Sequence, residues 1–86
     1  MRFAYVYFMR EQPERIRAVA PEHHGYWRGL ALSGYLGGPF TDRSGGLILF
    51  EADSIDEAEQ FASSDPFIRE NVLQRHRVKE WSPDGL

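Results

Sequence analysis

Two segments of this 86-residue chain are apolar on both of their alternating faces, and they constrain the fold more than any other feature. Residues 2–9 alternate aromatic with smaller apolar side chains, and residues 46–51 have the sequence GLILFE. A strand that is apolar on both faces lies inside a sheet and needs cover on each side. We therefore predict two central strands.

A helix is predicted between these two strands, because apolar residues recur at helical spacing over residues 13–33. The stripe consists of Ile16, Val19, Ala20, Trp27 and Leu30, with His23 on the same side. Pro21 removes one backbone donor inside this stretch, so we expect two helical pieces, with Pro21 near the start of the second. Gly34 is the expected stop.

The remaining segments predict two edge strands and a second helix. Residues 35–40 are short and broken by glycine and proline, as edge strands are, and residues 41–46 follow as a hairpin loop. Residues 54–57 (SIDE) form a capping box, which predicts a helix start. Asp65 and Pro66 fit the cap and first residue of a further helical turn. Residues 72–81 are mostly charged between their apolar positions, which favours the other edge strand.

The order of these elements, βαββαβ, is that of the ferredoxin-like α+β fold. We expect a single domain over residues 1–86, with a four-stranded antiparallel sheet and its helices on one face. Two helices cover only one face of such a sheet. Because the other face has no cover in one chain, we predict a homodimer that buries the open sheet faces of two copies across a two-fold axis.

The composition argues against several classes of protein. The chain has no cysteine, so it has neither a disulfide nor a thiolate nucleophile, and we expect a cytoplasmic protein. Its formal net charge of −3 disfavours nucleic acid as a partner. The N-terminal apolar run ends at Arg10, which is too short for a membrane span, and no glycine pattern matches a nucleotide-binding loop.

Three segments that are distant in the sequence are expected to meet at one edge of the predicted sheet. They are the helix that contains His23, the turn Gly38-Pro39-Phe40 and the segment that begins at Asp65. A histidine oriented by a carboxylate is a common general base near neutral pH, so His23 and Asp65 are candidate catalytic residues. A structural alternative is open for both: Asp65 as a helix cap, and His23 as a core histidine bonded to a backbone carbonyl.

The other polar and aromatic residues give weaker signals. Glu22, His23 and His24 do not predict a metal site, because neighbours on a helix point in different directions. His76 falls in a charged edge strand and is expected at the surface. Four aromatic residues either line a cavity for an aromatic ligand or fill the core, namely Tyr5, Tyr7, Tyr26 and Trp27.

Three short motifs occur in order along the chain: residues 23–28 (HHGYWR) followed by Gly34, the turn Gly38-Pro39-Phe40, and Asp65-Pro66-Phe67. Together they resemble the YCII-related family of small dimeric α+β-barrel proteins, over nearly the whole chain. The resemblance implies a His23/Asp65 active site in each protomer, with neither an organic cofactor nor a metal.

The same resemblance leads to a hypothesis about the reaction: a cofactor-free lyase, a dehydrochlorinase, that removes HCl from a small chlorinated hydroxylated aromatic by proton transfer. The alternatives are an isomerase that moves a proton on a small lactone or enol, and a dimeric binding or accessory protein without catalysis. Arg17 is the candidate for steadying an oxyanion or the departing chloride. The expected substrate-binding residues are Tyr7, Arg17, Tyr26, Trp27, Gly38, Pro39, Phe40 and Phe67.

Overall fold

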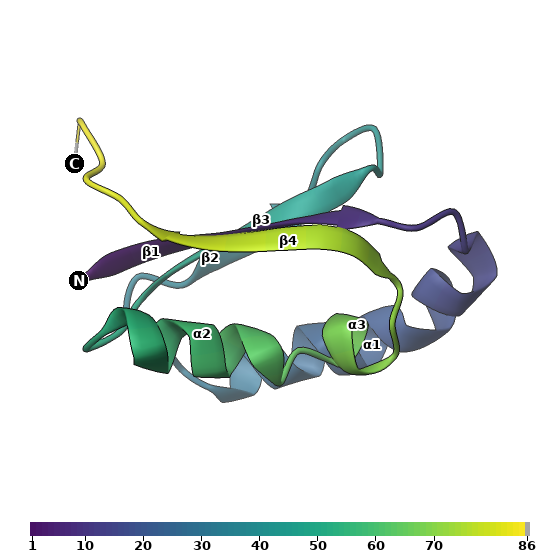
Figure 1. Cartoon of the computed structure of the whole chain (residues 1–86), viewed down its shortest axis with the longest axis horizontal. Helices are drawn as coiled ribbons and strands as arrows, with labels where there is room; N and C mark the ends of the chain where they lie inside the picture. The colour runs from purple at the N-terminus through teal and green to yellow at the C-terminus, as the bar shows by residue number, and fades with distance from the viewer. Residues whose placement is uncertain (86) are drawn as a thin grey trace.

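A four-stranded antiparallel sheet and three helices make up the chain, of which the computed structural model describes residues 1–85. The elements are β1 (Arg2–Met9), α1 (Pro13–Gly29), β2 (Leu36–Pro39), β3 (Gly45–Glu51), α2 (Ile55–Ser63), α3 (Pro66–Arg69) and β4 (Leu73–Glu80). The strand order is β2-β3-β1-β4, so β1 and β3 are central, as predicted. All helices lie on one face of the sheet (Figure 1), which confirms the ferredoxin-like α+β fold.

The two shorter helices begin where their capping residues predict. The hydroxyl of Ser54 accepts a hydrogen bond from the Glu57 N–H at 3.1 Å and caps α2. The Glu57 carboxylate reaches back to the N–H of Asp53 at 3.0 Å, one residue before the usual partner in a capping box. Asp65 caps α3, with Pro66 as its first residue.

Helix α1 is continuous through Pro21, so the prediction of two helical pieces is wrong. Pro21 lies on the exposed side of the helix, where water can bond the backbone carbonyl that its ring leaves without a partner. On the opposite side, Val19, His23 and Trp27 are all buried. Burial of this continuous stripe offsets the one missing hydrogen bond.

The end of α1 also differs from the prediction. The helix ends at Gly29, before the predicted stop at Gly34. Ala31, in the loop that leads to β2, has φ of 50°. Gly34 belongs to the next turn, where it has φ of 67° and a Cβ would lie 2.9 Å from the carboxylate of Glu51. Gly34 therefore allows the chain to enter β2 beside Glu51 and does not stop the helix.

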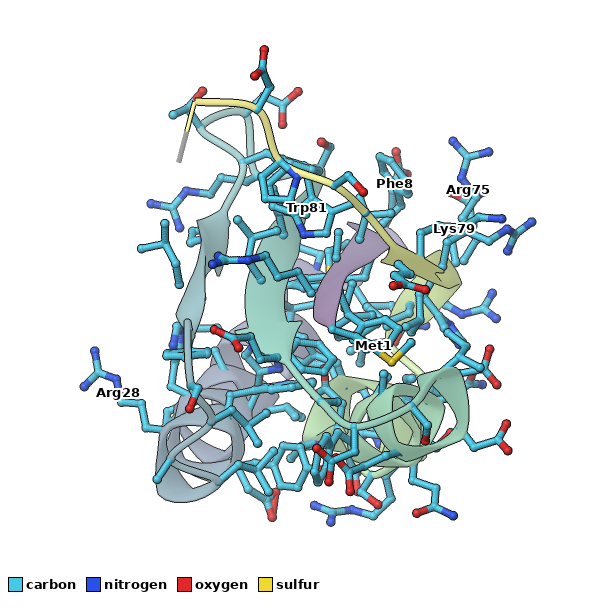
Figure 2. The ribbon with its side chains drawn as sticks, turned by 90° about the vertical axis from the view of Figure 1, so that its left-hand side faces the viewer. Met1, Phe8, Arg28, Arg75, Lys79 and Trp81 are labelled. Carbon is cyan, nitrogen blue, oxygen red and sulfur yellow. The ribbon has the colours of Figure 1, made fainter. Side chains whose placement is uncertain are left out.

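The two faces of the sheet differ in cover. On the face toward the helices, Phe3, Tyr5, Tyr7, Ile48 and Phe50 are buried and form the core with side chains of the helices. The opposite face has half-buried residues of β1 and β3 at its centre, and Leu36 of β2 is 69% exposed there. Figure 2 shows Phe8, Arg75, Lys79 and Trp81 on the side of the sheet away from the helices. We call this side the open face.

The longest helix, α1, has 17 residues and a polar exposed side. Within residues 1–85, no helix is both long and apolar enough to cross a membrane.

Candidate active site between the sheet and the helices

Asp65 lies at the junction of α2 and α3, beneath the helix-facing side of the sheet, and is 0% exposed. Its carboxylate accepts four hydrogen bonds. Oδ1 accepts from the ring Nδ1–H of His23 at 2.7 Å and from the N–H of Phe67 at 2.9 Å, while Oδ2 accepts from the Tyr5 hydroxyl at 2.9 Å and the Trp27 indole at 3.2 Å. A buried carboxylate is stable as an anion only with such partners.

His23 lies near the middle of α1 and is 4% exposed. At 2.7 Å from a carboxylate oxygen, Nδ1 must carry a proton, so in the neutral ring Nε2 has the free lone pair. The ring stacks on that of Phe67, with centroids 4.0 Å apart and planes inclined by 13°. The helix, the α3 cap and the stacked ring together fix the direction in which Nε2 points.

Tyr7 of β1 is the polar group that Nε2 faces. Its hydroxyl lies 3.4 Å from Nε2, a long and weak hydrogen bond. The hydroxyl passes over Gly46 of β3, where any Cβ would collide with it, so glycine at this position makes room for the tyrosine. Gly46 pairs with Pro39 of β2, which places the Gly-Pro segment on the next strand.

Burial and the charge of Asp65 keep both tyrosines of β1 protonated. Desolvation is the larger cause and the Asp65 carboxylate the next, and together they raise the pKa of Tyr5 and of Tyr7 well above the ordinary value of 10.0. Both hydroxyls are therefore proton donors at neutral pH. The arrangement has a base at Nε2, a neutral hydroxyl beside it and a carboxylate behind it, which is the set of groups that proton transfer needs.

The structure brings together five predicted site residues, namely His23, Asp65, Tyr7, Trp27 and Phe67. Trp27 contacts the carboxylate through its indole and is 0% exposed, so it supports Asp65 from within the core. Tyr5 was not among the predicted substrate-binding residues, although its place two residues before Tyr7 puts it on the same face of β1. That alternation was the available signal.

The other predicted binding residues lie apart from the His23/Asp65 pair. The Tyr26 hydroxyl donates to the backbone carbonyl of Phe61 at 2.6 Å and ties α1 to α2. Phe40 packs against Phe8, 6.0 Å between ring centroids, on the open face, so the expected convergence with His23 is wrong for this residue. Arg17 is exposed on α1 and forms no ion pair within residues 1–85. Gly38 pairs with Leu47 in the sheet.

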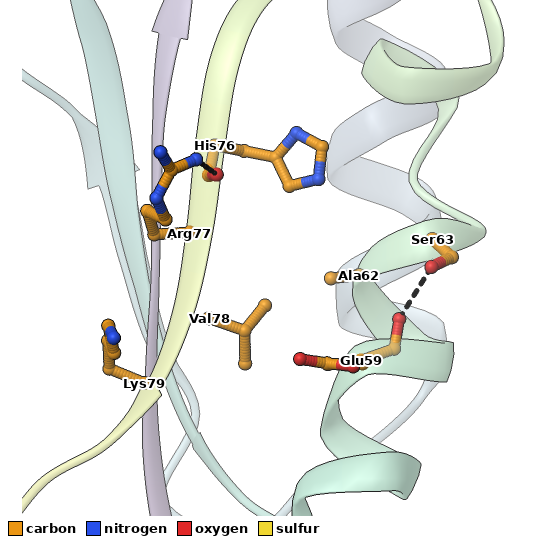
Figure 3. A pocket seen from close by; sticks show the side chains of 7 residues that line it. All are labelled: Glu59, Ala62, Ser63, His76, Arg77, Val78 and Lys79. Atoms are coloured by element: carbon orange, nitrogen blue, oxygen red, sulfur yellow. Dashed lines mark hydrogen bonds between the residues drawn. The ribbon is translucent and has the colours of Figure 1, made fainter.

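The two other histidines are separate from the carboxylate. His24 is exposed and meets the His23 ring edge-on at 5.4 Å; partial burial, and next the nearby His23, lower its pKa. His76 of β4 points toward the helices and lines a groove with Val78, Ala62 and Glu59, between β4 and α2 (Figure 3). No group of three potential metal-binding side chains occurs within the described part of the chain.

Comparison with known proteins places the chain in a family. The model of the YCII-related domain matches residues 1–82. The uncharacterized protein YjpA of Bacillus subtilis (strain 168) is 39% identical over 44 residues, which span 51% of this chain and 51% of that protein. The chain therefore matches about half the length of this curated relative.

The solved structures that share the fold include two that match nearly the whole chain. The first is 5-chloro-2-hydroxyhydroquinone dehydrochlorinase (TftG) from Burkholderia phenoliruptrix AC1100, in complex with 2,5-dihydroxybenzoquinone. It has a TM-score of 0.82 at 23% identity, with 95% of this chain and 94% of that chain covered. An antibiotic biosynthesis monooxygenase has a TM-score of 0.63 at 12% identity, with 95% and 98% covered.

Proposed function

The chain belongs to the YCII-related domain family, and from this premise we propose that it is a cofactor-free enzyme that transfers protons on a small hydroxylated aromatic compound. The observation that carries the proposal is the 2.7 Å contact between Nδ1 of His23 and Oδ1 of Asp65, which leaves Nε2 as the free base. Asp65 holds the working tautomer and stabilises the imidazolium that forms when Nε2 takes a proton.

The reaction proposed is the loss of HCl from a chlorinated hydroxyhydroquinone. His23 takes a phenolic proton, the ring ketonises and the carbon that bears chlorine gains a proton. Chloride then leaves as a second hydroxyl loses its proton, and the products are a hydroxylated quinone and HCl. No external oxidant is needed, because chloride departs with the electron pair of the carbon–chlorine bond.

The choice of substrate class is supported by the structural neighbour, whose structure holds 2,5-dihydroxybenzoquinone. At 23% identity this likeness shows the fold, so the substrate is part of the proposal. Arg17 lies apart from the pair on the exposed side of α1, so its role beside a developing oxyanion or the departing chloride stays a prediction. Because His23 is only 4% exposed, a substrate reaches Nε2 only when neighbouring side chains move.

The proposed assembly is a homodimer through the open face. Val6, Leu47 and Leu49 lie at the centre of this face and are half-buried in one chain. Apolar side chains on both central strands need cover, and a second copy related by a two-fold axis supplies a matching surface. Light scattering at micromolar concentration should report about twice the chain mass.

The same geometry also supports a second candidate, a binding or accessory protein in which the pair has a structural role. Asp65 is the N-cap of α3 and is completely buried, so its bonds to α1 and β1 join three elements of the core.

An isomerase that moves a proton on a small enol would use the same base without a leaving group.

Turnover separates these candidates. Protein dialysed against a strong chelator is mixed with 5-chloro-2-hydroxyhydroquinone, and chloride release is followed together with quinone absorbance. The lyase proposal expects both at equal rates, and the His23→Asn variant should lose both while remaining folded. Conversion of small enols or lactones without chloride release would favour the isomerase. No turnover of either class would favour the structural role.

A further inference from the structure

We propose that Tyr5 and Trp27 are positioning residues that fix the proton on Nδ1 of His23 by holding the far oxygen of Asp65. This inference deepens the proposed function, because it concerns the same pair and gives two further residues a role in it. Neither residue reaches the surface, since both are 0% exposed, so they act on a substrate only through Asp65.

The two oxygens of Asp65 have separate sets of donors. Oδ1 is shared by the His23 ring and the N–H of Phe67, whereas Oδ2 is shared by the Tyr5 hydroxyl and the Trp27 indole. The Oδ2 donors come from β1 and α1, two elements that do not adjoin Asp65 in sequence. Rotation of the carboxylate about its Cβ–Cγ bond would break bonds at both oxygens together, so the donors at Oδ2 lock the orientation of Oδ1.

Tyr5 and Trp27 also hold each other in place. Their rings stack with centroids 5.5 Å apart and planes inclined by 29°, at the centre of the core. Tyr5 keeps its proton because burial and the Asp65 charge raise its pKa. The two donors thus form a rigid support for the carboxylate, built into the sheet and the long helix.

The consequence concerns the tautomer of His23. A carboxylate that is free to turn no longer holds the Nδ1 proton, and the neutral imidazole can then carry its proton on Nε2 instead. In that tautomer Nε2 cannot accept a proton, so the base is lost even though His23 itself is unchanged.

Histidine tautomers are visible by NMR without any substrate, because protonated and unprotonated ring nitrogens have well-separated 15N shifts. At a pH where the His23 ring is neutral, we expect the wild-type protein to show a protonated Nδ1 and an unprotonated Nε2. In Tyr5→Phe, and more in Tyr5→Phe/Trp27→Phe, the two shifts should move toward each other as the second tautomer becomes populated. Unchanged His23 shifts in a folded double variant would overturn the proposal.

The matched control is Tyr26→Phe, which removes a hydroxyl from the residue next to Trp27. That hydroxyl donates to the Phe61 carbonyl and is not among the four hydrogen-bond donors to Asp65, so the His23 shifts should stay as in wild type. If Tyr26→Phe moved them as far as Tyr5→Phe does, the effect would be general loosening of the core and the positioning role would be wrong.

A measurement on the wild-type protein keeps the proposal testable if the double variant does not fold. The indole N–H of Trp27 should exchange with solvent roughly 100-fold or more slowly than that of Trp81, which is 38% exposed. Equal exchange rates would mean that the bond to Asp65 is not formed in solution.

The tautomer test and the test of the proposed reaction fail separately. If no turnover is found but Tyr5→Phe shifts the tautomer, the lyase proposal is wrong and the positioning role stands. If the protein does turn over a substrate, Tyr5→Phe should lower kcat by about tenfold, the equivalent of one hydrogen bond, and leave KM nearly unchanged. A wild-type kcat in that variant would contradict the positioning role.

Discussion

The two faces of the sheet differ in what covers them and in the side chains that they carry. The face toward the helices buries polar groups as well as aromatic rings, and every buried side-chain N or O atom within residues 1–85 has a hydrogen-bond partner. The open face has half-buried aliphatic residues at its centre and charged residues along β4, with Arg75 over the ring of Phe8 at 4.6 Å. Polar groups that are buried and directed suit chemistry, whereas an uncovered apolar surface suits association.

The comparison predicts that changes on the helix-facing side affect turnover first, and changes on the open face affect assembly first. The largest effect is expected from His23→Asn, which should lower turnover by roughly 10²–10⁴-fold, as loss of a general base does. Kinetics on the proposed substrate measure it. The control is His24→Asn, on the adjacent exposed position, which should leave turnover nearly unchanged. Equal losses of turnover in both variants would contradict the assignment of the base to His23.

The open face is tested by Leu49→Glu at the centre of β3. In the proposed dimer this substitution would bury a carboxylate between two apolar sheet faces, so the dimer dissociation constant should rise by roughly 100-fold or more. Sedimentation or light scattering over a dilution series measures it. Ala18→Glu, on the exposed side of α1, introduces the same charge away from this face and should leave the dimer intact. A dimer that tolerates Leu49→Glu would show that the open face is not the interface.

Asp65→Asn is expected to have a smaller effect on stability than on chemistry. Asparagine caps a helix about as well as aspartate, so α3 keeps its start. The asparagine side chain nevertheless has an NH2 group in place of one carboxylate oxygen. This NH2 group would face two of the hydrogen-bond donors that Asp65 accepts from. We expect the free energy of unfolding to fall by about 1–3 kcal/mol in urea titrations. A variant as stable as wild type would mean that the four contacts to Asp65 contribute little.

The smallest effect concerns alkaline pH. Because burial raises the pKa of Tyr5 and Tyr7 in the folded state, the unfolded chain releases these protons first, from about pH 10 upward. The contribution of the two protonated hydroxyls to the free energy of unfolding is fully present below that pH. It is lost as the pH rises toward the pKa values of the folded state. Tyr7→Phe should reduce the fall by up to about 1.4 kcal/mol per pH unit in urea titrations. An unchanged slope would contradict the burial of the Tyr7 hydroxyl.

Most of the fold could be predicted from local patterns. Residues 2–9 and 46–51 identified β1 and β3 because a strand that is apolar on both faces is unambiguous. The caps of α2 and α3 were predicted because a capping side chain and its helix start are close in sequence. Pro21 misled the prediction, since local propensity does not show that the tertiary contacts of His23 and Trp27 hold the helix together.

The candidate site was predictable only in part. His23 and Asp65 were found because each has its own local signal, one on a buried stripe and one before a proline. Alternation along β1 puts Tyr5 on the face of Tyr7, but it does not identify Asp65, 60 residues away, as the hydrogen-bond partner, so the support from Tyr5 was missed. Phe40 was expected at the same edge of the sheet as His23 because of the order of the elements. The pattern of β2, interrupted by glycine and proline, did not show that the Phe40 ring packs on Phe8 at the open face.

The central claim, that His23 is the group that meets a ligand, has a direct test in the three histidines of the chain. Each reports on a different region: His23 on the pair with Asp65, His24 on the exposed side of α1, and His76 on the groove between β4 and α2. Titration of 15N-histidine-labelled protein with 2,5-dihydroxybenzoquinone should shift the ring signals of His23 saturably and leave those of His76 nearly unchanged. Saturable shifts of His76 with an unmoved His23, or no shift of any histidine, would contradict it.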